Sequence, residues 1–541
     1  MILSTLFIVS CQHIDFRTFL EPQKVKEQSS TEPAHQDSAI KLDSKVSVET
    51  KAISLDDTIQ VTQPPVEPPP IANLWDRLRK GFKLDLTIDN RRTTSQLQWY
   101  RKHQSYLDRV TDRASRYLHF IVEEAEKRNM PLELALLPVV ESAFDPFAYS
   151  HGRAAGMWQF IPSTGRIYGL KQTWWYDGRR DIYASTHGAL DYLDYLQKRF
   201  DGDWLLALAA YNSGSGTVKK AIARNRKLGK KTDYWSLKLP KETSAYVPKL
   251  LAIAKLVNTP QAYNVTLNKI NNKPVFQSVD TSSQIDLAQA AQMAGISIEE
   301  LYLYNPGFNR WATDPKGPHR LLLPLATVDR FNQELTLLPK EQRLTWSRYN
   351  IRKGDTVSTI AKRFNITPSL LSSINNIRKN RIKAGDTLLI PKSSQGNSYY
   401  SLSAAQRLKA SQSRYNKKTS ASKITYTVQP GDSFWEIASK YKIGVRTLAK
   451  WNGMAPTDTL RAGQKIVIWS KSTATHKSPT SRSVVRKVNY KVRNGDSFAR
   501  IAGKFNVTIN QIKKWNNRLA KLKYLQPGQQ VTLFVDITNA R

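Results

Sequence analysis

A motif that recurs three times in the C-terminal part of this 541-residue chain constrains its fold more than any single residue does. Each copy begins with a tyrosine in a segment of residues that favour β-strands. A Gly-Asp pair follows, and after it come two segments with apolar residues at helical spacing. Each copy closes on an Asn and a short apolar run. The Gly-Asp step suits a tight turn with an Asp or Ser helix cap. The pattern predicts strand, helix, helix and strand in copies at residues 348–392, 425–469 and 489–534.

A fourth, weaker copy precedes these three, at residues 270–335. It keeps the order of helix, helix, Asn and strand around Asn305. Where the other copies have the Gly-Asp turn, it has Ser282-Ser283-Gln284. We therefore expect a degenerate unit that packs on the preceding domain.

Segments of biased composition separate these units. Residues 22–70 are rich in Pro, Glu, Ser, Thr and Gln, which predicts a disordered, extended tether over residues 11–72. Residues 393–423 and 470–487 are rich in Ser, Lys and Arg, which predicts flexible linkers. Several weak binding sites on flexible linkers gain avidity on a polymer with repeating sites.

One carboxyl group, that of Glu141, ends a mostly apolar run from Leu132 to Val140. A carboxyl among apolar side chains resists ionisation and can act as a general acid near neutral pH. The next acids lie in turn-like or less apolar settings, at Asp145, Asp177 and Asp181. Glycosidases commonly use two carboxyls, so we expect this one glutamic acid both to give and to take the proton.

The residues that follow Glu141 resemble the catalytic domain of lytic murein transglycosylases, lysozyme-like enzymes that cut the glycan strands of bacterial peptidoglycan. The resemblance covers residues 97–258, within an expected domain of residues 73–260. Glu141-Ser142 matches the catalytic Glu-Ser pair, although Trp158 stands where many relatives carry methionine. The resemblance implies that substrate is held by Ser142, Ser150, Gly156, Met157, Gln159, Tyr211, Asn212 and Tyr246.

The same resemblance implies the reaction. The bond between N-acetylmuramic acid and N-acetylglucosamine would be cut without water, and the muramyl 6-hydroxyl would form a 1,6-anhydro end. Structural alternatives exist for several residues: Ser142 is expected to hold the loop rather than react, and Tyr211 to Gly214 also fits a helix that ends at a glycine. For Tyr246 the structural alternative is a core position, because an isolated helical tyrosine is more often in the core.

The three C-terminal copies resemble LysM domains, small βααβ modules that bind glycans containing N-acetylglucosamine. The weaker copy resembles a degenerate LysM unit. In the family the groove lies between the loop after the first strand and the loop before the second. The groove assignment carries over to Gly354, Asp355, Thr356, Asn375, Gly431, Asp432, Ser433, Asn452, Gly495, Asp496, Ser497 and Asn516. The structural alternative is that these Asp, Ser and Asn residues only cap or end helices.

The N-terminus carries the only cysteine of the chain, Cys11, behind a short apolar run from Ile2 to Val9. This arrangement resembles a lipobox, which implies a signal peptide of residues 1–10 and a lipidated Cys11. No Lys or Arg precedes the apolar run, unlike most signals of this kind. Gln12 after the cysteine suggests sorting to the outer membrane, so we expect a periplasmic enzyme anchored to the cell envelope by lipid.

The charge of the chain is strongly positive, with 82 Lys and Arg against 44 Asp and Glu. A basic surface can attract nucleic acid. However, the basic residues concentrate in the linkers and around the repeats, and no nucleic-acid motif interrupts them. We therefore expect peptidoglycan and anionic lipid as the polyanionic partners, and no nucleic acid.

The sequence as a whole predicts a multidomain, monomeric protein. A mainly α, lysozyme-like catalytic domain is followed by small α+β (βααβ) LysM modules joined by flexible linkers. The expected function is that of a peptidoglycan lytic transglycosylase with Glu141 as its acid and base, and with no metal or cofactor. Two alternatives stay open: a hydrolytic muramidase like goose-type lysozyme, and a wall-binding scaffold without activity.

Overall fold

The computed structural model describes residues 71–364, 366–418, 421–470, 485–493, 495–505, 507–520, 522 and 525–536. The expected signal peptide, the lipidation site Cys11 and nearly all of the expected tether lie outside the described residues. The same is true of most of the expected linker at residues 470–487.

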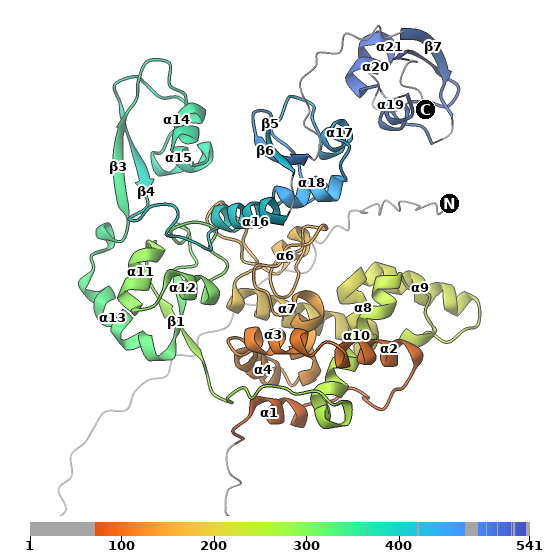
Figure 1. Ribbon diagram of the computed structural model, residues 1–541, viewed down its shortest axis with the longest axis vertical. Coiled ribbons are helices and arrows are strands. Elements are labelled where there is room, and N and C mark those ends of the chain that lie inside the picture. Colours follow the sequence, from red (N-terminus) through yellow and green to blue (C-terminus); the bar gives the residue numbers. More distant parts are fainter. Residues whose placement is uncertain are drawn as a thin grey trace, which may run out of the picture. The chain divides into compact units, whose positions relative to one another are not determined.

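The N-terminal domain is helical, as predicted (Figure 1). Its helices begin at capping side chains where the sequence supplies them. Asp181 accepts a hydrogen bond from the amide of Ala184, and Asp203 accepts one from that of Leu206. The helices are α1 (Leu74–Lys80), α2 (Arg91–Arg101), α3 (Gln104–Ala114), α4 (Leu118–Lys127), α5 (Leu137–Ser142), α6 (Pro162–Ile167), α7 (Ile182–Arg199), α8 (Trp204–Ser213), α9 (Ser215–Lys227) and α10 (Lys241–Asn258).

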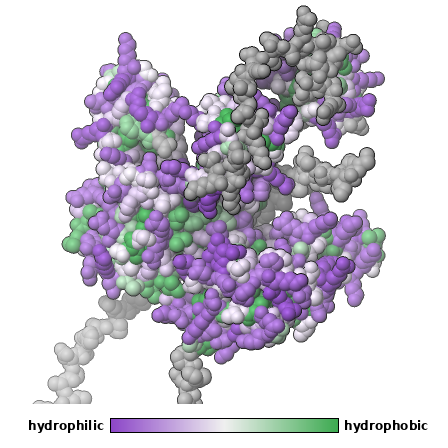
Figure 2. Space-filling view, viewed as in Figure 1, coloured by the Kyte–Doolittle hydropathy of each residue, from purple (hydrophilic) through white to green (hydrophobic). Residues whose placement is uncertain are grey.

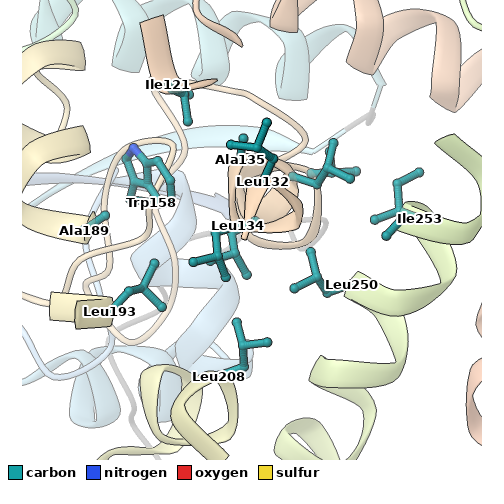
Figure 3. Close-up of a cluster of buried hydrophobic side chains, with 14 of the residues drawn as sticks. Ile121, Leu132, Leu134, Ala135, Trp158, Ala189, Leu193, Leu208, Leu250 and Ile253 are labelled. Atoms are coloured by element: carbon teal, nitrogen blue, oxygen red, sulfur yellow. The ribbon is translucent and has the colours of Figure 1, made fainter. Parts of the chain in front are cut away.

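The apolar run before Glu141 forms the centre of this domain. It folds as a 3₁₀ turn, η1 (Leu132–Leu136), followed directly by α5. Figure 3 shows Leu132, Leu134 and Ala135 surrounded by side chains from several other elements. These neighbours are Ile121 of α4, Trp158, Ala189 and Leu193 of α7, Leu208 of α8, and Leu250 and Ile253 of α10. Close packing on all sides fixes α5, and therefore Glu141, relative to α8 and α10.

The weaker copy folds as the sequence predicts. Its strands β1 (Phe276–Asp280) and β2 (Arg320–Pro324) pair antiparallel, and helices α11 (Leu287–Ala294) and α12 (Ile298–Tyr304) lie between them in the chain. A further helix, α13 (Val328–Leu337), follows the second strand.

The three stronger copies repeat this order, each with a two-stranded antiparallel sheet beside two helices (Figure 1). The predicted order of strand, helix, helix and strand is confirmed in all of them, and the third module adds a short helix at Asn517–Ala520 before its second strand. The elements are β3 (Thr345–Asn350), α14 (Val357–Arg363), α15 (Pro368–Ile374) and β4 (Thr387–Lys392); β5 (Ser422–Thr427), α17 (Phe434–Lys440), α18 (Val445–Trp451) and β6 (Lys465–Ser470); and β7 (Val485–Lys491), α19 (Phe498–Phe505), α20 (Ile509–Trp515), α21 (Asn517–Ala520) and β8 (Gln530–Asp536).

One hydrogen-bonding unit, which we call the Asn clamp, recurs in all four copies. In the weaker copy the Asn305 amide donates to the carbonyls of Leu301 and Leu322, and its oxygen accepts the amide of Leu322. Asn375, Asn452 and Asn516 make the same three bonds in their own copies. The clamp ties the end of the second helix to the second strand, so the weaker copy shares the LysM fold although it lacks the Gly-Asp turn.

The segment of residues 393–423 differs from its prediction as a flexible linker. It contains helix α16 (Ala404–Lys418), and the first residues of β5 also fall within it. Tyr400 is only 1% exposed, and its hydroxyl donates to the buried carboxylate of Asp286 at 2.9 Å. The prediction from composition was wrong because it counted the Ser, Lys and Arg residues of the segment. It took no account of the few apolar and aromatic side chains that pack against buried partners.

Hydrophilic residues cover most of the visible face of the molecule (Figure 2), as expected from the excess of Lys and Arg. Over the part of the chain that the structure describes, no helix combines the length and the apolar character that crossing a bilayer requires.

Candidate active site

Helix α5 places Glu141 in its last turn. The helix ends because Ala143 adopts a left-handed conformation, with φ of 54°. The amide of the next residue, Phe144, returns a hydrogen bond to the carbonyl of Pro138 at 3.0 Å. Glu141 itself is half-buried at the edge of the core. The apolar run thus brings one carboxyl to a rigid, partly desolvated position.

Tyr246 of α10 is the direct partner of this carboxyl. Its hydroxyl donates to Oε1 of Glu141 at 2.5 Å, and its ring is only 3% exposed. Burial raises the pKa of Glu141 to about 7, although the hydrogen bond from Tyr246 acts in the opposite direction. A carboxyl with a pKa of about 7 exists in both protonation states near neutral pH, so it can serve as acid and then as base.

Helix α8 supplies Tyr211 and Asn212 beside this pair. The Tyr211 hydroxyl donates to the carbonyl of Trp158 at 2.9 Å. Its pKa is raised well above the usual value, first by burial and then by the nearby carboxylate of Glu141. Asn212 accepts a hydrogen bond from the hydroxyl of Thr243 at 2.8 Å, which joins α8 to the start of α10.

The segment from Gly156 to Gln159 is joined to α5 by Ser142. The Ser142 hydroxyl donates to the carbonyl of Met157 at 3.0 Å, which supports the expected holding role. Gly156 has φ of 81°, and a Cβ there would lie 1.9 Å from the carbonyl oxygen of Arg179. Only glycine fits this position. Gln159 is also left-handed, with φ of 49°, and its side-chain Nε2 donates to the carbonyl of Gly156 at 2.7 Å.

Two predicted substrate-binding residues have other roles in the structure. The Met157 side chain is 1% exposed and belongs to the hydrophobic core, so it is not presented to a cleft; only its carbonyl takes part, through Ser142. The hydroxyl of Ser150 accepts hydrogen bonds from the amides of Gly152 and Ala154. It therefore organises a turn, a role that the short polar side chain of serine allows.

The acids that follow Glu141 are engaged elsewhere. Asp177 pairs with Arg179 at 2.8 Å and with Arg180 at 3.1 Å. Although burial alone acts to raise the pKa of Asp177, hydrogen bonds from Arg179 hold it below the usual range. Asp181 caps α7, as described above. Asp145 accepts the amide of Phe147 at 2.9 Å. None of these three carboxyls has a hydrogen bond to Glu141 or Tyr246.

Sequence reasoning missed a charged pair on α10, Glu242 and Lys249. Both share a helix face with Tyr246, four residues before it and three after it. Glu242 acts to raise the pKa of Glu141, and Lys249 acts to lower it. Their spacing from Tyr246 in the sequence could have indicated that they lie near Glu141. That spacing is informative only once the contact between Tyr246 and Glu141 is known.

A second carboxyl inside the apolar run, that of Glu133, was also missed. It is fully buried, and it accepts the amides of Lys83 at 2.9 Å and Leu84 at 2.7 Å. Burial raises its pKa. Because its oxygens are taken by these backbone amides, Glu133 fastens the N-terminal segment to η1.

In the LysM modules, the Asp of each Gly-Asp turn has partners of its own. Asp355 accepts the hydroxyl of Tyr349 at 2.6 Å and the amide of Arg352 at 3.0 Å. Asp432 and Asp496 repeat both bonds in the other two modules. The preceding glycines have φ of 88°, 92° and 84°, as this tight turn requires. The three turns are Gly354-Asp355, Gly431-Asp432 and Gly495-Asp496.

The remaining predicted groove residues also have internal roles. Thr356, Ser433 and Ser497 accept the amides of Thr359, Glu436 and Arg500, respectively, and so cap or start their helices. Asn375, Asn452 and Asn516 belong to the Asn clamp. These bonds support the structural alternative for the Asp, Ser, Thr and Asn side chains.

Comparison with protein-family models divides the chain in the same order. The Transglycosylase SLT domain matches residues 119–234. The LysM-like domain of lytic transglycosylase MltD matches residues 275–340, which is the weaker copy. The LysM domain matches residues 349–391, 426–469 and 490–534.

Individual relatives agree with this division. Membrane-bound lytic murein transglycosylase D of Escherichia coli is 40% identical over 413 residues, which cover 74% of this chain and 87% of the relative. The probable peptidoglycan endopeptidase LytE of Bacillus subtilis is 31% identical over 175 residues, or 32% of this chain and 47% of the relative.

Among solved structures, the 70 kDa soluble lytic transglycosylase of Escherichia coli is 20% identical, with 26% of this chain and 24% of that chain covered and a TM-score of 0.21. Family membership therefore rests on the sequence relationship and on the domain order. The chain belongs to the membrane-bound lytic murein transglycosylase D family, with a transglycosylase domain, a degenerate LysM-like unit and three LysM modules.

Proposed function

We propose that this chain is a peptidoglycan lytic transglycosylase in which Glu141 is the single acid and base. The substrate bond is the β-1,4 link between N-acetylmuramic acid and N-acetylglucosamine. The observation that carries the assignment is the half-buried Glu141 carboxyl, held by Tyr246 at 2.5 Å, with a pKa raised to about 7.

In the proposed reaction Glu141 gives up one proton and takes back another, so its protonation state is restored. Protonated Glu141 gives its proton to the glycosidic oxygen, and the bond from that oxygen to the anomeric carbon of the muramyl residue breaks. Positive charge develops on the sugar ring. The carboxylate of Glu141 then takes the proton of the muramyl 6-hydroxyl, and O6 bonds to the anomeric carbon. The product is a 1,6-anhydro end, and no water is consumed.

The neighbouring side chains support positioning of the sugar. Tyr246 fixes the orientation of the carboxyl, and we propose that Gln159, Tyr211 and Asn212, from two other segments, contact the sugar. General acid–base catalysis contributes roughly 10² to 10⁴ in rate, so orientation of the internal hydroxyl has to supply much of the rest.

A hydrolytic muramidase is the second candidate, and one observation favours keeping it. Glu242 is an exposed carboxyl whose charge acts on Glu141, so it could serve a water molecule as base. Digestion of purified sacculi, with mass analysis of the muropeptides, separates the two reactions because the anhydro product lacks one water. Product ends at the hydrated mass would overturn the transglycosylase proposal. Unchanged lysis by Glu141→Gln would overturn both, because both reactions need this carboxyl, whereas no lysis by either protein would favour the scaffold.

We further propose that the LysM modules hold the glycan while the catalytic domain cuts. The modules would use the backbone of their Gly-Asp turns, since the Asp and Asn side chains have internal partners. Retention of the Glu141→Gln protein on purified peptidoglycan tests this. A DNA column at matched salt is the control, because net charge alone would favour both columns.

The place of action that we propose is the periplasm, with Cys11 lipidated and the chain held as a monomer at the outer membrane. The apolar run, the cysteine and Gln12 support this. Membrane fractionation of the wild type and Cys11→Ser tests it. A Cys11→Ser protein that stays in the outer-membrane fraction would contradict lipid anchoring.

A further inference from the structure

A cavity of about 450 Å³ is bounded by residues that are not part of the active site. Trp174, Arg310 and Trp311 form one wall. Residues of the segment 393–406 form a second, and apolar side chains of the first LysM module close the remaining side. The volume falls in the range of small-molecule sites, about 300–1,000 Å³.

The aromatic wall is held in place by its own contacts. The guanidinium of Arg310 lies 4.3 Å from the ring centroid of Trp174, and its Nε donates to the Trp174 carbonyl at 3.2 Å. Trp175 packs edge-on against both indoles, with centroid distances of 4.7 Å to Trp174 and 5.3 Å to Trp311. The wall therefore needs little ordering when a ligand arrives, which favours binding.

The second wall is fixed by Asp286, the cap of α11. Its carboxylate accepts the hydroxyl of Tyr400 at 2.9 Å and the amide of Ser394 at 2.9 Å. Within the same wall, the side-chain amide of Gln406 donates to the carbonyl of Asn397 at 2.8 Å. A segment whose composition suggested a flexible linker is thus folded into one side of a cavity.

The charge and polarity of the cavity point to one kind of ligand. Arg310 and Lys392 are cations, and the described residues that line the cavity include no acid. Hydroxyl and amide groups lie among them, together with the half-buried indole of Trp311. Indole faces suit the apolar face of a sugar ring, and paired cations suit carboxylates.

We propose that this cavity is a second, non-catalytic site for a muropeptide, an N-acetylated sugar that carries a peptide with free carboxylates. The sugar ring packs on Trp311, and Arg310 and Lys392 bind the peptide carboxylates. The proposal rests on the proposed action on peptidoglycan. In this proposal the folded segment 393–406 helps to bind the peptide-bearing glycan strand at a place other than the site of cleavage.

The test uses the full chain with Glu141→Gln, so that turnover does not consume the ligand. Calorimetry measures binding of a disaccharide-peptide monomer and of the same compound with amidated carboxylates. A saturating neutral oligomer of N-acetylglucosamine occupies the LysM grooves. Lys392→Gln and Arg310→Met remove one charge each from the cavity. Lys353→Gln removes an exposed charge from the first LysM module outside the lining.

Each cavity variant should weaken binding of the free-carboxylate ligand about tenfold, the effect of one lost charged hydrogen bond. The amidated ligand should bind weakly to all proteins, and Lys353→Gln should match the parent. Because Lys392 is exposed, its variant folds even if Arg310→Met does not. The proposal would be overturned if Lys392→Gln bound the free-carboxylate ligand with the same affinity as the parent. It would also be overturned if a photo-crosslinking form of this ligand attached only to the catalytic domain or to the LysM turns. The catalytic proposal fails separately, through retained activity of Glu141→Gln.

Discussion

Glu141 and Tyr246 stand 105 residues apart in the chain, and their side chains meet at 2.5 Å between the tyrosine hydroxyl and the carboxyl. The contact joins the last turn of α5 to the second turn of α10. It lies against the core that η1 organises, so the carboxyl that we assign to catalysis is as rigidly placed as the core itself.

Replacement of Glu141 by Gln should abolish most of the activity while leaving the fold intact. The side-chain carbonyl of the glutamine can still accept the hydrogen bond from the Tyr246 hydroxyl. The amide cannot give a proton to the substrate and take one back. We expect solubilisation of sacculi to fall by roughly 10² to 10⁴. Asp194→Asn, which loses an exposed ion pair with Lys198, is the control and should keep full activity. Comparable rates for the two variants would contradict the assignment.

The same substitution should make stability less dependent on pH. The pKa of Glu141 is about 7 in the folded state, above its ordinary value of 4.5. Between these values the folded state binds more protons than the unfolded state, so stability falls as pH rises from about 4.5 to 7. Glu141→Gln removes this loss. At pH 8 we expect it to be more stable than the wild type by about 1–3 kcal/mol, discounted for partial exposure. At pH 4.5 the wild type and the variant should unfold at the same denaturant concentration.

The charged pair on α10 should move the pH profile in opposite directions. Glu242 acts to raise the pKa of Glu141, so Glu242→Gln should shift the alkaline limb of kcat/KM to lower pH. Lys249 acts to lower it, so Lys249→Met should shift that limb to higher pH. The double variant should return close to the wild type. If both single variants change the rate at every pH without moving the limb, the two residues do not tune Glu141.

Substitution of Gly156 should be far more damaging than substitution of another left-handed glycine. A Cβ at Gly156 would lie 1.9 Å from the Arg179 carbonyl, whereas one at Gly169 would meet no atom within 4 Å. Gly169→Ala bears only the backbone strain, about 1–2 kcal/mol. Gly156→Ala should cost more than this, measured by thermal unfolding, and should lower activity because Gln159 depends on the same segment. Similar melting temperatures for both variants would show that the segment can yield.

The Asn clamp should be required for the stability of a LysM module. Asn452 is only 9% exposed, and Asn452→Ala removes the three hydrogen bonds that its side chain makes. We expect a loss of about 1–3 kcal/mol, confined to the second LysM module and detectable by hydrogen exchange. Ser439→Ala, at an exposed position of the same module, should leave exchange unchanged. Lost glycan binding with full protection of the module would instead indicate a direct contact by Asn452.

Much of this architecture could be predicted from the sequence, because its signals are local. The repeated turn, helix and Asn pattern predicted the βααβ order, and the apolar run before Glu141 predicted a shielded carboxyl. The prediction failed for residues 393–423, where Tyr400 finds the buried Asp286, and for Met157, whose side chain turns into the core. Neither outcome is encoded in the local composition.

The sequence by itself determined the order of the modules and which carboxyl is the candidate acid, because periodicity, turn chemistry and apolar flanks act over a few residues. Only the tertiary structure decided which side chains surround that acid. Tyr246, Glu242 and Lys249 reach it because α10 packs against η1 and α5, and that packing depends on contacts between residues about a hundred positions apart. In the LysM modules the Asn side chains reach the second strand, 14 to 16 residues further along the chain, whereas the Asp partners lie only three and six residues away.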